Sequence, residues 1–441
     1  MTARRFLPLG LAMLALALTA CNGGRKALPD TTVRVVNVVP RLFSIDYRRE
    51  ESTSSTLTFK SGSVFTYDED TYDFNVDALN AAVGAPQRVL SFPQQVLAGH
   101  TYTFVFYDTG TSVDRLVLEA TDIPANASDT QVDVVNAATD QPAMDFYLTP
   151  TNSGIVGATP LGTLAFRDQV AARRLPAGAY EITVTAAGDP STVILKSQSL
   201  NLPAGRYSSF VIAPEQGASN NPISVVALGD VAGVFVNVDA PASLRVINAA
   251  ADLAPRDIAV DSQFSPPLFA AVPFATETAY APVPISSALK LNATPPGNPG
   301  TLELDAALAT GPTVQYTVLV SGMPGALGQV SFIDDNRRIP GLGRVRFYNA
   351  APQITSIDFF VIPPGTDLGT VFADASLPPP SGSETGVVPG NYELWVSQTG
   401  TSTIVAGPIP ITIESGGLYG VLATNNANGV TADITLLDDF P

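Results

Sequence analysis

The chain has 441 residues and carries 40 acidic against 23 basic residues, a formal net charge of −17 at pH 7. Only 14% of its residues are charged and 45% are hydrophobic, so it has ample material for packed cores and is not a basic nucleic-acid binder. This length predicts three or four domains of about 100 to 150 residues each. Frequent proline and glycine, with no long helical pattern beyond the N-terminus, favour short strands joined by turns.

The first 20 residues have the order of a secretory signal peptide. Arg4 and Arg5 precede an apolar stretch over 6–18, and Thr19 and Ala20 are small residues at its end. The apolar stretch is shorter than the roughly 20 residues that a membrane span needs. We therefore expect residues 1–20 to be cleaved after export. The alternatives are a plain signal peptide without lipidation and an anchor helix that stays in place.

The end of this segment resembles the lipobox of bacterial lipoproteins. The sequence LTAC at 18–21 places the only cysteine of the chain where that class is acylated and then cleaved. The resemblance implies that Cys21 is lipidated and anchors the protein in a membrane, and Asn22 after it points to the outer membrane of a Gram-negative cell. Residues 21–30 then form a short tether. Two or three acyl chains, each contributing about 0.8 kcal/mol per buried methylene, make such an anchor effectively permanent.

The rest of the chain repeats with a unit of about 100 residues. Four short apolar segments end in asparagine, and an aspartate follows each asparagine after nine residues: Asn37 and Asp46, Asn136 and Asp145, Asn248 and Asp257, Asn349 and Asp358. Self-similarity at a fixed period is the signature of tandem domains. We expect both residue types to be structural, with the asparagine capping a turn through its own backbone and the aspartate opening the next strand.

The repeats divide the exported chain into four predicted domains, at 31–125, 126–240, 241–339 and 340–441. Repeat two reads as seven strands, at 131–136, 144–149, 162–167, 179–186, 192–201, 206–213 and 223–229. Seven short, half-buried strands predict an all-β, immunoglobulin-like Greek-key sandwich. Because the linkers are short, we expect a semi-rigid rod of roughly 150 Å.

Glycine-containing turns deliver a tyrosine to several strands. Tyr102, Tyr180, Tyr207 and Tyr392 all follow such a turn. The pattern predicts a tyrosine corner, in which the ring packs inward and the hydroxyl bonds back to the turn. The alternative is a core tyrosine whose hydroxyl is solvated.

The asparagine-ended strands, the nine-residue step and the tyrosine strands resemble a bacterial extracellular family catalogued as domain of unknown function 4397. The resemblance covers nearly all of 31–441 and is best in repeats two and four. It implies an all-β fold and a cell-envelope location, and it brings no established chemistry.

The chain is poorly equipped for catalysis, so we expect a protein that is not an enzyme. Its one histidine, His100, lies in a predicted turn, and no metalloprotease, nucleophile-elbow or phosphate-loop motif is present. A pair of acids acting as in glycosidases stays open, because the sequence does not show which carboxylates meet in space.

Two acidic features are weak calcium candidates, although we predict no metal and no cofactor. Asp68, Asp70 and Asp73 lie close together in repeat one, and acid pairs at 334–335 and 438–439 lie near repeat ends. Hard cations need several such oxygens. Neither feature has the twelve-residue ligand loop, and acidic turns in an acidic protein are ordinarily solvated.

The only tryptophan, Trp395, is the tentative binding residue. Its aligned counterparts in the other repeats are Asn75, Thr183 and Lys290, so the indole occupies an outward position that is polar elsewhere. An outward tryptophan stacks on a sugar or fills an interface. The alternative is that a neighbouring loop, such as 378–386, covers it.

These features predict a lipid-anchored cell-envelope protein that binds, adheres or scaffolds without catalysis, with an unidentified protein or glycan as partner. The second hypothesis is a glycan-binding surface lipoprotein that uses Trp395, and the third is an unrecognised envelope hydrolase.

Overall fold

The computed structural model describes residues 30–79, 86–124, 126–215, 221–401, 403–425 and 431–437. The signal peptide, Cys21 and the acids at 438–439 lie outside the described residues. The described part is built of strands, with one short 3-10 turn, η1 (Leu368–Thr370), so the all-β prediction is confirmed.

The strands form four sandwiches, each with two sheets around one apolar core. The first sandwich contains β1 (Thr31–Val38), β2 (Ser44–Arg49), β3 (Ser52–Thr58), β4 (Gly62–Tyr67), β5 (Asp70–Leu79), β6 (Gln87–Val96), β7 (His100–Asp108) and β8 (Val113–Thr121). One sheet has the order β4-β1-β7-β8 and the other β3-β2-β5-β6. Strand β1 runs parallel to β7 although the other pairs are antiparallel.

The other three sandwiches repeat this order with small additions. The second contains β9 (Asp129–Asn136), β10 (Met144–Pro150), β11 (Gly162–Leu164), β12 (Gln169–Pro176), β13 (Gly178–Ala186), β14 (Asp189–Lys196), β15 (Leu200–Leu202), β16 (Tyr207–Pro214), β17 (Ile223–Gly229) and β18 (Gly233–Phe235). The third contains β19 (Ala242–Ala250), β20 (Arg256–Val260), β21 (Phe269–Val272), β22 (Thr276–Glu277), β23 (Ala281–Val283), β24 (Ser286–Thr294), β25 (Leu304–Thr310), β26 (Gln315–Met323) and β27 (Ala326–Ile333). The fourth contains β28 (Gly343–Ala350), β29 (Ile357–Ile362), β30 (Ala375–Leu377), β31 (Ser381–Val387), β32 (Gly390–Gln398), β33 (Ile404–Ile413), β34 (Leu418–Asn425) and β35 (Ala432–Leu437).

The strand order differs from that of an immunoglobulin domain, whose sheets are ABED and CFG. Here the first strand lies between the fourth and the seventh. The seven-strand expectation for repeat two misses β12, a strand at the edge of its sheet whose side chains are mostly exposed. With Arg173 and Arg174 in its middle, β12 lacks the apolar alternation that marks a half-buried strand.

The four repeat asparagines join the two sheets of each sandwich, and all four are fully buried. The Asn136 carbonyl accepts a hydrogen bond from Ala138 N at 2.9 Å, and its amide donates to Leu164 O at 3.2 Å, across to β11. Asn37, Asn248 and Asn349 make the same two kinds of bond. The predicted turn cap is confirmed. The bond to the opposite sheet uses the amide N–H as a donor, so the side chain must both accept and donate.

Three of the four repeat aspartates hold a turn on the next hairpin of the same sheet, whereas Asp46 accepts a hydrogen bond from Thr56 on the neighbouring strand β3. Asp145 accepts from Gly188 N at 2.8 Å, and Asp257 accepts from Gly297 N at 2.8 Å. Asp358 accepts from Thr399 Oγ1 at 2.8 Å. These aspartates therefore serve the fold, as the sequence predicts.

The tyrosine corner is confirmed at three of its four predicted positions. The hydroxyls of Tyr180 and Tyr392 donate to the carbonyls of Pro176 and Val388, four residues back, at 2.7 and 2.8 Å. The Tyr102 hydroxyl accepts from Leu97 N at 3.3 Å. Tyr207 is the exception, because its place on β16 is one residue out of step and its ring leaves the core.

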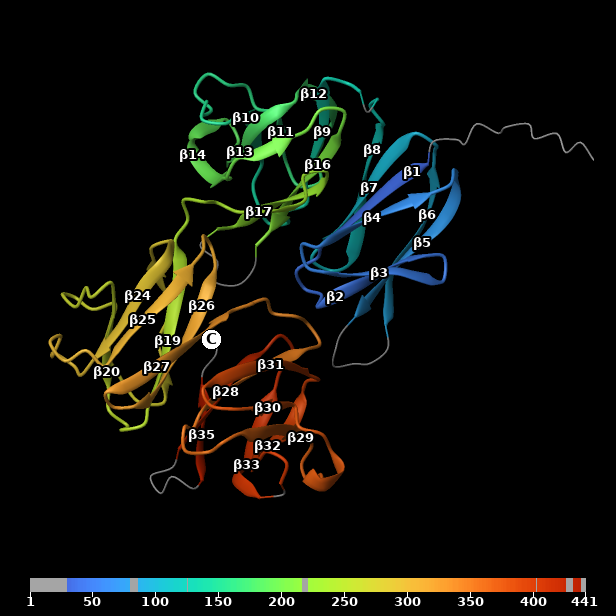
Figure 1. The fold of residues 1–441 in the computed structure, drawn as a ribbon. Coiled ribbons are helices and arrows are strands. Elements are labelled where there is room, and N and C mark those ends of the chain that lie inside the picture. Colours follow the sequence, from blue (N-terminus) through green and yellow to red (C-terminus); the bar gives the residue numbers. More distant parts are fainter. Residues whose placement is uncertain are drawn as a thin grey trace, which may run out of the picture.

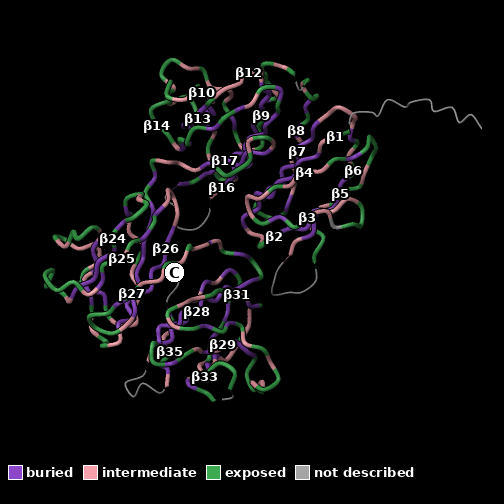
Figure 2. Tube along the Cα trace, in the orientation of Figure 1, coloured by how far each residue is buried: buried purple, intermediate pink, exposed green. Residues whose placement is uncertain are grey.

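The rod prediction is wrong. The first and second sandwiches share an apolar cluster, and so do the third and fourth. Figure 1 shows the four sandwiches folded back on one another rather than set in a row. Figure 2 shows buried residues following the strands and exposed residues gathering in the outer loops.

Replacing Asn136 with alanine tests the sheet-joining role. The change removes two hydrogen bonds and leaves the buried Leu164 carbonyl unpaired, so Asn136→Ala should destabilise the second sandwich by about 2 kcal/mol. Urea unfolding followed by fluorescence or circular dichroism measures the loss. The exposed Asn201→Ala in the same sandwich is the control, and equal stabilities of the two variants would contradict the role.

Candidate functional site

The sandwiches meet along two apolar interfaces, here called seams. Networks of buried polar and charged side chains lie at both seams. The first seam joins the first and second sandwiches through Val36, Val38, Val105, Tyr107, Leu118, Val135, Ala137, Val211, Ala213, Val226 and Leu228. The second seam joins the third and fourth through Ile247, Ala249, Leu319, Tyr348, Ala350, Leu422 and Leu437. Each seam uses the outer face of the sheet that holds the parallel strand pair, which is β1 with β7 in the first sandwich and β9 with β16, β19 with β26 and β28 with β34 in the others.

The two sandwiches of the first seam meet through equivalent positions. Thr103 on β7 and Ser209 on β16 occupy the same place in their sheets, opposite Arg34 and Asp133, and their hydroxyls lie 3.0 Å apart. Such self-complementary contact is the mark of a local two-fold axis.

At one matching position in each seam, a glycine leaves room for a side chain of the partner sandwich. A Cβ on Gly62 of β4 would lie 2.5 Å from Leu228 Cδ2 of the second sandwich. A Cβ on Gly382 of β31 would lie 2.8 Å from the Phe332 ring of the third sandwich. Both glycines occupy the fourth strand of their sandwich, so the first and fourth sandwiches play the same part in their pairs.

A buried polar group lies inside the first seam. Arg34 donates from Nη2 to Tyr207 O at 2.7 Å, and its guanidinium lies 4.8 Å from the centre of the Tyr207 ring. The Tyr207 hydroxyl donates to Asp133, which is 1% exposed. Burial raises the pKa of Asp133 to about 6, against the opposing effects of Tyr207, Ser209 and Arg34. Burial also raises the pKa of Tyr207.

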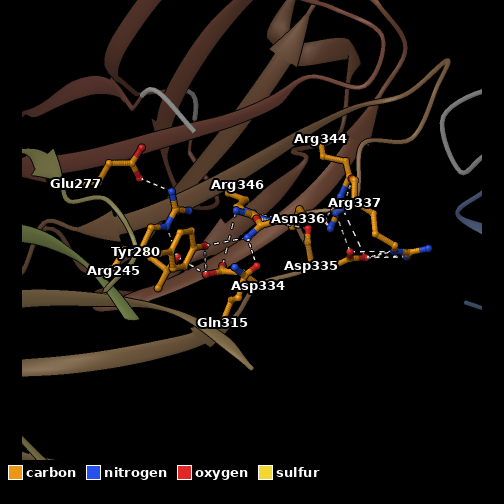
Figure 3. Close-up of polar contacts among 12 residues, drawn as sticks. Arg245, Glu277, Tyr280, Gln315, Asp334, Asp335, Asn336, Arg337, Arg344 and Arg346 are labelled. Atoms are coloured by element: carbon orange, nitrogen blue, oxygen red, sulfur yellow. Dashed lines mark hydrogen bonds and ion pairs between the residues drawn. The ribbon is translucent and has the colours of Figure 1, made fainter. Parts of the chain in front are cut away.

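The second seam carries a larger polar network (Figure 3). Arg245 donates to Thr317 Oγ1 at 2.7 Å and to Glu277 Oε2 at 2.8 Å. Tyr280 and Thr317 both donate to Asp334 Oδ2 at 2.6 Å. Asp334 therefore binds hydroxyl groups inside the protein, where the sequence placed a candidate calcium ligand.

The linker 334–342 continues this network into the fourth sandwich. Arg346 donates to Asn336 Oδ1 at 2.9 Å and to Glu384 Oε2 at 2.9 Å. Glu384 also pairs with Arg344 at 2.6 Å. The second acid of the pair, Asp335, contacts the same guanidinium of Arg344 at 3.5 Å. Both acids of the linker thus pair with arginines, and these guanidinium groups balance the carboxylate charge.

Burial and charge act in opposite directions on the two linker acids. Burial raises the pKa of Asp334, although Arg346 and Arg245 oppose the shift. Burial acts in the same sense on Asp335, but the hydrogen bonds and charge of Arg337, with the charge of Arg344, bring the pKa of Asp335 below its ordinary value.

Arg337 connects the linker to the first sandwich. It pairs with Asp335 at 2.7 Å, donates from Nη1 to the carbonyls of Pro40 and Leu42 at 3.3 and 3.1 Å, and lies 4.8 Å from the Phe59 ring centre. This one side chain therefore ties the two pairs of sandwiches together.

A cavity of about 330 Å³ lies beside Arg337, where three sandwiches and the linker meet. Lys60 and Glu215 line it as an ion pair between the first two sandwiches, and burial lowers the pKa of Lys60. The remaining lining is mixed, and it includes Val236, Val314 and Ile333. All charged groups that line the cavity are paired with groups of opposite charge. This pairing indicates a structural junction and not a reaction centre.

The predicted site residues are scattered over the described chain. His100 pairs with the exposed Glu119 at 3.0 Å at the edge of β7 and β8. Among the described residues no three His, Cys, Asp or Glu side chains are arranged to hold a metal, so Asp68, Asp70 and Asp73 do not form a site. In the same described ranges, no helix is long and apolar enough to cross a bilayer.

Trp395 lies half-buried on β32, and its Nε1 donates to Glu393 Oε2 at 3.2 Å. Strand register shows that its counterparts are Asn75, Thr183 and Asn292, so the alignment with Lys290 is wrong by two residues. Sequence reasoning missed the arginines of the seams, although a charged residue three positions before the repeat asparagine (Arg34, Asp133, Arg245 and Arg346) is a readable signal.

Arg337→Gln should loosen the contact between the two pairs of sandwiches. The variant loses the carbonyl contacts and the charged pair with Asp335, which together weaken the contact by about 2 kcal/mol. Small-angle X-ray scattering should then show a larger radius of gyration than in the unaltered protein. Arg174→Gln, on an exposed side chain, is the control. An unchanged scattering curve for Arg337→Gln would contradict the role.

The Asp133 carboxyl should give the first seam a pH dependence. Its pKa in the fold, about 6, lies above the ordinary value of 3.8, so the folded chain keeps the proton longer and loses stability as the pH rises between these values. Asn in place of Asp133 keeps an acceptor for Tyr207 and removes this titration. Between pH 4 and pH 7, the urea midpoint of Asp133→Asn should therefore fall less, or rise more, than the urea midpoint of the unaltered chain. Parallel pH profiles would refute the assignment.

Comparison with known proteins gives a family and little more. The model described as Domain of unknown function (DUF4397) matches residues 31–147 and 242–360. Each match starts at the first strand of one sandwich and ends in the second strand of the next, so it favours repeats one and three, where the sequence analysis favoured two and four.

No curated protein matches the chain. Among solved structures, the Bacillus anthracis TIE protein is 9% identical, with a TM-score of 0.16, over 88% of this chain and 66% of that one, just under two thirds of its length. This likeness is too low to carry an argument. The family matches cover more than half of the sequence, and the chain belongs to the DUF4397 family.

Proposed function

We propose that the protein is a non-enzymatic lipoprotein of the bacterial cell envelope. Cys21 carries the lipid that holds the protein in the membrane. Asn22, the residue that follows, favours the outer membrane. The folded body of four sandwiches acts as a binding, adhesion or scaffolding module.

The observation that carries this proposal is where the chain uses its buried charge. Four of the five arginines that are buried in the described residues, Arg34, Arg245, Arg344 and Arg346, lie at a seam or beside the linker. The fifth, Arg256, pairs with Asp252 and Glu303 inside the third sandwich. Buried charges are costly unless they are paired, and here they fix one arrangement of sandwiches. A body with a fixed shape on a short tether suits a role in holding a partner at the membrane.

The hydrolase hypothesis gains no support from the described residues. His100 faces Glu119 on an exposed strand edge, and its only charged contact there is that carboxylate. The buried acids Asp133 and Asp334 bind tyrosine, serine or threonine hydroxyls within the seams. Neither arrangement presents a proton donor to a substrate.

The glycan hypothesis with Trp395 is weakened by the geometry of the indole. Sugar-binding tryptophans need an exposed ring face, and this ring is half-buried with its N–H bonded to Glu393. A glycan array with Trp395→Ala as the matched variant decides it, because loss of a specific signal would restore this hypothesis.

Cys21→Ala should abolish lipidation. In cells fed a labelled fatty acid, the unaltered protein should carry the label and fractionate with outer membranes. The variant should remain unlabelled and keep residues 1–20, because lipoprotein cleavage follows acylation.

Label on Cys21→Ala would remove the anchor from the proposal. The soluble form that begins at Asn22 tests the non-enzymatic part. Turnover of a polysaccharide or ester by this form, abolished by one carboxylate or serine substitution, would overturn it.

A further inference from the structure

The outer sheet of the second sandwich contains a cleft of about 400 Å³. It lies between β13, β14 and the loop 151–161, on the sheet that does not take part in the first seam. Figure 1 shows β13 and β14 on the side of this sandwich away from the first. The cleft is lined by Asn152, Ile155, Glu181, Thr183, Val193 and Lys196, with Gly154 and Pro190.

In the other three sandwiches the residue equivalent to Thr183 has a longer side chain and makes a side-chain hydrogen bond. Thr183 pairs with Tyr147 as Asn75, Asn292 and Trp395 pair with Arg48, Ala259 and Phe360. Asn75 donates to Glu50 O at 2.6 Å, and Asn292 accepts from Ser262 N at 2.7 Å. Both asparagines are buried, at 3% and 1% exposure, and Thr183 is 7% exposed where it lines the cleft, so these three repeats differ here in side-chain length and not in burial.

In the fourth sandwich the equivalent residue carries an indole. Trp395 lies half-buried on the outer sheet and donates its ring N–H to Glu393, two residues earlier on the same strand. The second sandwich keeps the matching acceptor, Glu181, two residues before Thr183. It lacks the ring, because threonine is much smaller than tryptophan.

We propose that this cleft binds a planar aromatic ring that carries an N–H, such as the indole of a tryptophan. Glu181 would accept the ring N–H as Glu393 accepts that of Trp395. Its carboxylate has one weak contact within the described chain, from Asn152 N at 3.4 Å. Ile155, Pro190 and Val193 supply apolar contact, and Val193 is 46% exposed without a ligand.

The surroundings favour a tryptophan within a polypeptide over a free indole. Val156, the next residue of the loop after Ile155, is fully exposed and extends the apolar surface beyond the length of one ring. The ammonium of Lys196 lies on the strand opposite Thr183, where it suits a carbonyl or carboxylate of the bound chain. This inference deepens the proposed binding role, and the two can fail separately, because acyl labelling does not report on the cleft.

The test uses N-acetyl-tryptophanamide as the probe and ligand-observed NMR with the form that begins at Asn22. A probe of this size should bind with a dissociation constant on the order of 1 mM. N-acetyl-phenylalaninamide, which lacks the ring N–H, should bind at least about fivefold more weakly because a charge-assisted bond is lost. Free indole is the second arm, and tighter binding of indole than of the amide would assign the site to small molecules.

Two exchanged variants locate the site. Thr183→Trp places the indole of the fourth sandwich in the cleft and should abolish binding, while Glu181→Gln should weaken it about fivefold. Trp395→Thr should open a second, equivalent cleft and increase the bound fraction. Melting temperatures check that each variant is folded. No binding by the unaltered protein at 10-fold the expected constant, roughly 10 mM, or full binding by a folded Thr183→Trp, would overturn the proposal.

Discussion

The rest of the structure depends on one constraint, which is that the central sheet of each sandwich is apolar on both faces. The strands β1, β9, β19 and β28 are buried along nearly their whole length, and so are β7, β16, β26 and β34. One face fills the core of the sandwich, and the other has no cover within it. Burial of apolar area outweighs the ordering cost only if a second sandwich provides that cover. The repeats are therefore paired, and a single repeat is an incomplete folding unit.

The sequence could have shown that these sheets need a cover on both faces, but it could not have shown which sandwiches pair. Runs such as VRVVNVV at 33–39 are apolar without alternation, the pattern of a strand buried on both faces. A reading for half-buried strands finds the repeats, the capping asparagines and the tyrosine corners, which depend on neighbours close in sequence. It misses the seams and the fold-back at Arg337, since those contacts join residues far apart in sequence: Arg34 and Tyr207 are 173 positions apart, and Arg337 and Leu42 are 295 apart. The one-residue error at Tyr207 comes from aligning strands by their tyrosine, and the two-residue error at Lys290 arises where the strand at 286–293 has no tyrosine to fix its register.

The seams also show how polar groups specify an arrangement that apolar contact leaves open. Valine and alanine faces pack in several ways, whereas Arg34 under the Tyr207 backbone and Arg346 between Asn336 and Glu384 each accept one geometry. Gly62 and Gly382 add a steric requirement at the matching position. The first and fourth sandwiches thus carry the same contact set, and the second and third carry its complement. The chain is in effect two related pairs, joined by Arg337.

Pairing determines which surface is left to vary. The sheets of the seams are constrained on both faces, so new binding chemistry has to arise on the other sheet, whose outer face touches no second sandwich in either seam. Position 183 and its equivalents lie there, and they range in size from threonine to tryptophan. A repeat that closes this position with its own side chain has no use for a ligand there. The second sandwich has the acceptor, Glu181, beside the small Thr183 and has no aromatic ring at that position. The group that fits this cleft is therefore one like the indole that Trp395 provides in the fourth sandwich.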